Sequence, residues 1–211
     1  MIDREELIAI ALRAGASHAG ILETTAIEFH EDFRKACEQN FCRKYDTNWM
    51  GPPAVGTIPE LKRRVLGFAE GMLFQSTHPV ASNFDRKGIE AAARAHDAVF
   101  RELVRALRAR YPAEEILPLG AGCCSVCERC AYLDREPCRH PLLAASSVEA
   151  YGMNVIALQK RVGLPYSFGK TTVCFVGLIL YAPVGSGASA AGASAPGASA
   201  PSGSGTGSNS R

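Results

Sequence analysis

Apolar and polar residues recur along the chain with two different periods, and these periods predict its helices and strands. Between residues 85 and 111, apolar side chains return every three or four positions while charged side chains fill the opposite face. That pattern predicts a long amphipathic helix packed on a sheet. Shorter helices are predicted over residues 3–15, over the segment "IPELKRRVLGFAEG", and over residues 146–163.

Capping residues support the first and last of these shorter helices. Asp3 with Glu6 resembles a capping box, as does Ser146 with Glu149. His96 lies on the apolar side of the long predicted helix. We therefore expect His96 to be a core histidine rather than a metal ligand.

Strands are predicted where apolar runs are short and rich in β-branched and aromatic residues, at residues 18–29, 71–80, 114–122 and 171–183. Because strands alternate with helices, we expect an α/β or α+β fold, a single compact domain whose helices pack on a mixed sheet. The pattern leaves the strand order open. Cys174 lies within the most apolar strand and is expected to be a buried, inert thiol.

The C-terminal segment has a different composition from the rest of the chain. Residues 185–211 are almost entirely Gly, Ala, Ser and Pro. Such a segment has no apolar surface to offset the entropy lost on ordering, so it is predicted to be a disordered tail. Residues 1–184 are expected to form one cysteine-rich domain.

Charge and hydropathy exclude several classes of protein. The chain has 23 basic and 21 acidic residues, which creates no general field for nucleic acid or a membrane surface. The longest apolar run, residues 173–184, is too short to span a bilayer. The N-terminus is acidic where a secretory signal carries positive charge, so we expect a cytoplasmic protein. In a reducing cytosol, clustered cysteines more often bind metal or perform redox chemistry than form disulfides.

The segment "CCSVCERCAYLDREPCRHP", residues 123–141, holds five of the chain's 8 cysteines. Cys124, Cys127 and Cys130 recur at every third position, and Cys138 follows. Zinc sites usually take their ligands as two separated pairs. Three thiolates spaced in this way on one loop, with a fourth farther away, instead resemble a ferredoxin run. The spacing therefore favours a [4Fe-4S] cluster ligated by these four cysteines.

Other interpretations of the same cysteines stay open. The thiolates could hold Zn²⁺ in a structural or regulatory module, or they could serve packing or a thiol switch. Counted from Cys123 through Cys127 and Cys130, the spacing is that of radical-SAM enzymes, whose cluster leaves one iron open to substrate. Only about sixty foldable residues follow Cys130, and this is too few for the barrel that such a motif ordinarily opens.

A second group of cysteines precedes the long helix. Cys37 and Cys42 lie ahead of Trp49 and a Pro-Pro turn. At this point the chain resembles a cysteine-rich family of unknown function, the "predicted metal-binding protein" family common in anaerobic microbes. The matching motifs are Cys37, Cys42, Tyr45 and Trp49; Cys124, Cys127 and Cys130; and residues 137–141, 147–150 and 165–169.

The resemblance implies metal binding and leaves the reaction open. One departure affects the sites: the family pattern has a cysteine before the two prolines, and this chain has Gly51. Cys37 and Cys42 alone are too few to close a cubane. The first site is therefore lost, completed by a non-cysteine ligand, or structural, and we expect one cluster per chain.

These observations lead to one principal functional hypothesis. We expect an iron–sulfur protein that passes single electrons to or from a redox protein partner. The alternatives are a structural or regulatory zinc module and an enzyme with an open-iron cluster.

Overall fold

A five-stranded mixed sheet forms the centre of the fold, with strand order β1-β2-β5-β3-β4. The computed structural model describes residues 3–183, so the tail predicted over residues 185–211 lies outside the described residues. The strands are β1 (His18–Glu23), β2 (Phe68–Pro79), β3 (Leu117–Gly120), β4 (Ser146–Ser147) and β5 (Thr172–Pro183). All neighbouring pairs are antiparallel except β3 and β4, which are parallel. The predicted mixed sheet is confirmed, in an α+β arrangement.

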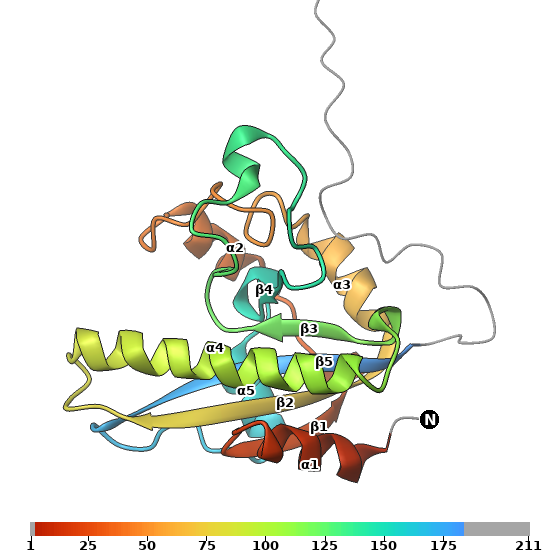
Figure 1. Cartoon of the computed structure of the whole chain (residues 1–211), viewed down its shortest axis with the longest axis vertical. Helices are drawn as coiled ribbons and strands as arrows, with labels where there is room; N and C mark the ends of the chain where they lie inside the picture. Colours follow the sequence, from red (N-terminus) through yellow and green to blue (C-terminus); the bar gives the residue numbers. More distant parts are fainter. Residues whose placement is uncertain (1–2, 184–211) are drawn as a thin grey trace, which may run out of the picture.

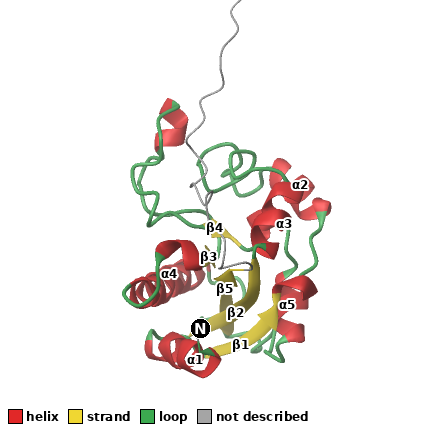
Figure 2. Cartoon of the chain, turned by 90° about the vertical axis from the view of Figure 1, so that its right-hand side faces the viewer, coloured by secondary structure: helices red, strands yellow, loops and turns green. Residues whose placement is uncertain are grey.

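Helices cover both faces of this sheet (Figures 1 and 2). Helices α1 (Arg4–Arg13) and α4 (Arg86–Arg108) pack on one face, and α3 (Ile58–Leu66) and α5 (Val155–Arg161) pack on the other. Helix α2 (Glu31–Glu38) follows the first strand. Short 3₁₀ turns complete the described chain: η1 (Thr24–Ala26), η2 (Ala113–Glu115), η3 (Ala131–Asp134) and η4 (Glu149–Tyr151).

The two long central strands explain why the sheet must be covered on both sides. Along β2, Met72 and Phe74 belong to the core beneath α1 and α4, whereas Leu73 belongs to the core beneath α3 and α5. Successive side chains of a strand point to opposite faces, so a continuous apolar run needs partners on both. The single compact domain predicted from the sequence is thereby built from two apolar cores that share one sheet.

The capping interactions agree with the sequence only in part. The Asp3 side chain caps α1, but it accepts from the backbone N–H of Glu5 at 2.8 Å. Glu6 instead contacts Arg110 and accepts from the hydroxyl of Tyr111 at 3.3 Å, which ties α1 to the end of α4. The predicted reciprocal pair of Asp3 and Glu6 is therefore wrong, because Glu6 is engaged in a tertiary contact.

The predicted helix over residues 146–163 is also wrong in its first half. Residues Ser146–Ser147 form β4 beside β3, and the chain then makes the η4 turn. Gly152, with φ +75°, ends this turn in a left-handed conformation that interrupts any continuous helix. Helix α5 begins only after Asn154, whose side chain accepts from the N–H of Ala157 at 3.2 Å.

Both cysteine-rich segments lie at one end of the molecule, beyond β3 and β4. Figure 1 shows α2 and the loop after it next to the loop that links β3 with β4. In this view both segments lie above the sheet. Among the helices of residues 3–183, none is long and apolar enough to cross a membrane.

Candidate metal centre

The principal cysteine loop begins and ends at two adjacent strands. It leaves β3 after Gly120 and returns at β4, where Ser147 is the register partner of Gly120. The N–H of Val148 donates to the carbonyl of Gly120 at 3.1 Å and closes the base. The loop of residues 121–145 therefore projects from a fixed base, and this base sets where its cysteines can lie.

Turns inside the loop bring its later cysteines back toward its start. Cys130 precedes η3, and Arg135 then adopts a left-handed conformation with φ 58°. The N–H of Glu136 donates to the carbonyl of Ala131 at 3.0 Å, which reverses the chain ahead of Cys138. Cys124, Cys127, Cys130 and Cys138 are all half-buried, whereas Cys123 is exposed.

The environment of Cys124 is the best defined of the four. Burial raises the pKa of its thiol, and the negative charges of Cys138 and Cys130 raise it further. Hydrogen bonds from the backbone N–H groups of Val126 and Ala145 to the sulfur lower this pKa. The sulfur therefore lies within electrostatic range of two other predicted ligands and faces two backbone donors.

The predicted ligands share one loop without converging on a point. Among residues 3–183, no three His, Cys, Asp or Glu side chains are gathered closely enough to hold a metal ion. Thiols must lose their protons before they bind a metal. Without a metal the cysteine side chains stay protonated, and no attraction draws their sulfur atoms together. The donor set fits a thiophilic metal or cluster, since it offers four thiols and two backbone donors. The four cysteines can surround such a metal or cluster only if the loop of residues 121–145 rearranges.

The second cysteine segment packs directly against this loop. The Trp49 Nε1–H donates to the carbonyl of Glu136 at 2.9 Å, and its ring meets the ring of Tyr132 edge-on at 4.9 Å. The Tyr132 hydroxyl contacts Asp46. Sequence reasoning treated the two segments as separate sites, but these contacts join them into one region.

Asn48 is the residue of this region that sequence reasoning missed. It is only 5% exposed, and its Oδ1 accepts from the N–H of Met50 at 3.1 Å. Its Nδ2 lies 3.5 Å from the sulfur of Cys123. A buried amide requires partners, and here one of them is a thiol. The only sequence feature that could have indicated Asn48 is its position between Cys42 and the Pro-Pro turn. A single polar residue there is too weak a signal to assign it a role.

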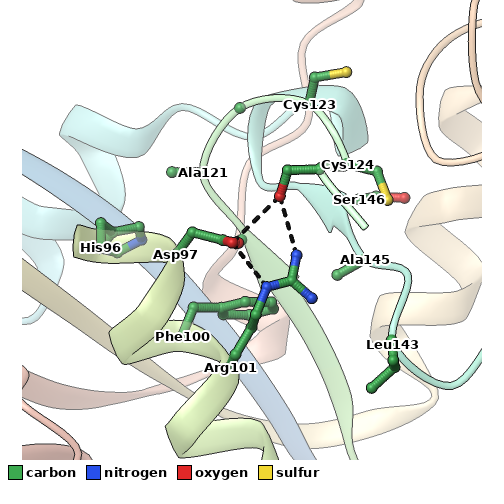
Figure 3. A pocket seen from close by; sticks show the side chains of 13 residues that line it. His96, Asp97, Phe100, Arg101, Ala121, Cys123, Cys124, Leu143, Ala145 and Ser146 are labelled. Atoms are coloured by element: carbon green, nitrogen blue, oxygen red, sulfur yellow. Dashed lines mark hydrogen bonds and ion pairs between the residues drawn. The ribbon is translucent and has the colours of Figure 1, made fainter. Parts of the chain in front are cut away.

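A pocket separates α4 from the start of the cysteine loop (Figure 3). Asp97 and Arg101 of α4 form an ion pair at 2.7 Å, and both bond Ser125, at 3.3 and 3.0 Å respectively. This trio fixes the loop immediately after Cys124.

His96 lines this pocket and is 2% exposed, so the predicted core position is confirmed. Its Nδ1 lies 2.8 Å from the hydroxyl of Ser76, which lies 2.8 Å from the Nε2 of His78. The Nε2 of His96 has no hydrogen-bond partner among the described residues. Burial, together with the nearby charge of His78, lowers the pKa of His96 to about 4, so the ring is neutral at physiological pH.

Cys174 belongs to the central sheet rather than to either cysteine segment. It is half-buried in β5, and the Nε2 of Gln159 donates to its sulfur at 3.8 Å. Burial raises the pKa of this thiol to about 11. The thiol is therefore protonated at physiological pH, which agrees with the predicted inert thiol, but Cys174 is half-buried rather than buried as the sequence predicted.

Comparison with known proteins places these observations in a family. No curated protein and no solved structure matches the chain. One family profile, described as "Predicted metal-binding protein (DUF2284)", matches residues 20–181. This range contains both cysteine segments, the Trp49 contact that joins them and all strands except part of β1 and β5. The chain belongs to this family of predicted metal-binding proteins.

Proposed function

We propose that the protein carries one [4Fe-4S] cluster, ligated by Cys124, Cys127, Cys130 and Cys138, and transfers single electrons. The supporting observation is the single loop between β3 and β4, which holds all four thiols on one base. Such a cluster, when bound, accepts and donates one electron at a time. The family supports metal binding, and the spacing of the thiols supports this type of cluster.

The chain's own groups would tune such a cluster. Hydrogen bonds to cluster sulfur are among the features that set a cluster's potential. The N–H groups of Val126 and Ala145 already face the sulfur of Cys124. Ala145 lies next to β4 and Val126 follows the fixed Ser125, so both donors are held by structure outside the loop's centre.

The position of the loop supports the proposal of a redox protein partner. The four thiols are half-buried at one end of the molecule, so a partner that docks on this end could approach the cluster closely. Leu133, Leu142 and Leu143 belong to the same loop and are exposed, with Leu142 64% exposed. Leu142 and Leu143 are adjacent in the sequence, and exposed apolar side chains next to a functional loop favour contact with another protein. A reducing, cytoplasmic environment would keep the thiols available for the metal.

Anaerobic metal and sulfide analysis, with electron paramagnetic resonance before and after reduction, tests this proposal. We expect about four irons and four sulfides per chain and a signal that appears on one-electron reduction. Cys127→Ser should abolish the iron, and Cys174→Ser, which changes a thiol of β5 outside both cysteine segments, should retain it. A colourless protein with stoichiometric zinc would contradict the proposal and establish the zinc module.

A further inference from the structure

The pocket between α4 and the cysteine loop is lined by a buried histidine that has one unpaired nitrogen. Side chains of α4 face the start and the end of the loop of residues 121–145 across this pocket (Figure 3). Among them, His96 is 2% exposed, and its Nε2 has no hydrogen-bond partner among the described residues. Buried polar atoms of folded proteins are almost always paired. An unpaired ring nitrogen in the wall of a pocket therefore indicates a ligand that supplies the missing partner.

We propose that this pocket binds a small neutral molecule, or the end of a larger one, that carries a primary carboxamide group and forms a hydrogen bond with the Nε2 of His96. Cys124 also lines the pocket, so the bound group would lie beside a predicted metal ligand. The proposal goes beyond the electron transfer proposed above, and it does not depend on which metal the four cysteines bind.

A hydrogen-bonded chain holds the His96 ring in place. The Nδ1 of His96 lies 2.8 Å from the hydroxyl oxygen of Ser76 on β2, and the same oxygen lies 2.8 Å from the Nε2 of the half-buried His78. The two nitrogens of an imidazole ring point in nearly opposite directions. With Nδ1 bound to Ser76, the Nε2 of His96 therefore points away from this hydroxyl and is free for a ligand.

The same chain explains why the ligand should both donate and accept hydrogen bonds. The Ser76 hydroxyl has one proton, which it can donate to only one of the two histidines. If it donates to the Nδ1 of His96, the Nε2 of His96 carries a proton and is a donor. If it accepts from that Nδ1, the Nε2 is an acceptor. A carboxamide has an N–H donor and a C=O acceptor, so it can pair with either form of the ring.

The charges of the pocket favour a neutral ligand. Asp97 and Arg101 form an ion pair at 2.7 Å, and no other Asp, Glu, Lys or Arg is present among the described residues that line the pocket. The His96 ring packs against the rings of Phe74 and Phe175, with centroids 5.7 Å apart in both pairs. A charged ligand would lose its hydration here without gaining an unpaired opposite charge, and this loss is costly.

The size of the pocket limits the bound group to a few atoms. The cavity has a volume of about 20 Å³ for the centres of water-sized groups. On this measure a single water needs about 10–15 Å³, so a ring would not fit. The wall at Gly122 is open, since a Cβ atom added there would meet nothing within 4 Å. A larger molecule could therefore place its carboxamide inside the pocket and extend past Gly122.

Three probes of one size and different charge test the proposal on the full-length protein with its metal. Formamide is neutral, formate is an anion and formamidinium is a cation, and each has three heavy atoms and one C–H proton. Saturation-transfer NMR of this proton measures binding at neutral pH. We expect saturable formamide binding in the millimolar range, since three heavy atoms support no tighter affinity. Formate and formamidinium should bind at least about tenfold more weakly.

Matched variants assign the binding to the His96 ring. His96→Phe keeps an aromatic ring and should abolish saturable formamide binding. Ser76→Thr and Ser76→Val have nearly the same shape, but only threonine keeps the hydroxyl. Ser76→Thr should therefore retain the affinity, whereas Ser76→Val should weaken it about three- to tenfold, the effect of one hydrogen bond. Phe84→Leu changes an exposed residue outside the pocket and should bind formamide like the wild type.

Several results would overturn the proposal. Absence of saturable formamide binding in the wild type would leave the Nε2 of His96 to water alone. Tighter binding of formate or formamidinium would contradict the neutral ligand, and unchanged affinity in His96→Phe would place the formamide elsewhere. Iron and sulfide content, measured on the same samples, keeps the two proposals separate. A protein with four irons that does not bind formamide would refute only this proposal, and one that binds formamide without iron would refute only the cluster.

Discussion

Acidification should destabilise the fold through His96, and a variant without this histidine should resist that effect. The ring of His96 is buried, with ring centroids 5.7 Å from both Phe74 and Phe175. Protonation places a charge in this apolar environment. His96→Phe keeps an aromatic ring between the same neighbours and removes the titrating group, so it is the matched control.

The magnitude follows from the change in pKa on folding. Burial lowers the pKa of His96 from 6.5 to about 4. The unfolded chain therefore takes up the proton first, and stability is complete above pH 6.5. As the pH falls from 6.5 toward about 4, this contribution is lost. The shift corresponds to about 3 kcal/mol of unfolding free energy.

Urea unfolding across this range of pH measures the effect. The free energy of unfolding is extrapolated to zero denaturant at each pH for the wild type and His96→Phe, at matched metal content. We expect the wild type to lose about 3 kcal/mol more than the variant. Because the pH dependence of the two proteins is compared, a constant difference in their free energies of unfolding cancels. His78 is present and titrates in both proteins. Equal pH dependence of the two proteins would refute the reasoning, because it would mean that His96 is not buried as a neutral ring.

Three further predictions concern the cysteine loop. Removal of the metal should increase proteolysis within residues 121–145 and spare α4, because the loop has few buried side chains to order it without its ligand; unchanged cleavage after complete metal loss would contradict this. Cys124→Ser should lose the iron while Cys123→Ser keeps it, as metal analysis will show; the reverse order would support the open-iron enzyme. Trp49→Phe should destabilise the protein by about 1 kcal/mol in urea unfolding, since it removes the bond to Glu136, whereas the exposed Phe84→Leu should change little.

The long helix and the central strands could be predicted because their patterns are local. In α4 the apolar period and the Asp85 cap lie within one continuous segment, and its predicted bounds agree closely with Arg86–Arg108. The start of the predicted helix at Ser146 failed for the opposite reason. Ser146 pairs with Leu119 of β3, and the capping pattern that begins with this serine contains no information about that distant partner. Local propensity is overridden wherever a strand is completed across the chain.

In the candidate site, too, local features could be predicted from the sequence and non-local ones could not. The spacing of Cys124, Cys127 and Cys130 is local, so the sequence could nominate these residues before any fold was known. The relation of Asn48 to Cys123 is not local, since it depends on the packing of two loops. Sequence reasoning therefore gave no role to Asn48, although this residue connects the two cysteine segments.

The two cysteine segments are held together by contacts that need no metal. The Trp49 Nε1–H donates to the carbonyl of Glu136, and the Trp49 ring meets the ring of Tyr132 edge-on. Both partners belong to the loop of residues 121–145, whose two ends are fixed where β3 and β4 pair. A hydrogen bond and an aromatic contact do not depend on the protonation state of any thiol. The thiols of this loop would therefore close around a metal from a loop whose base and one flank are already fixed.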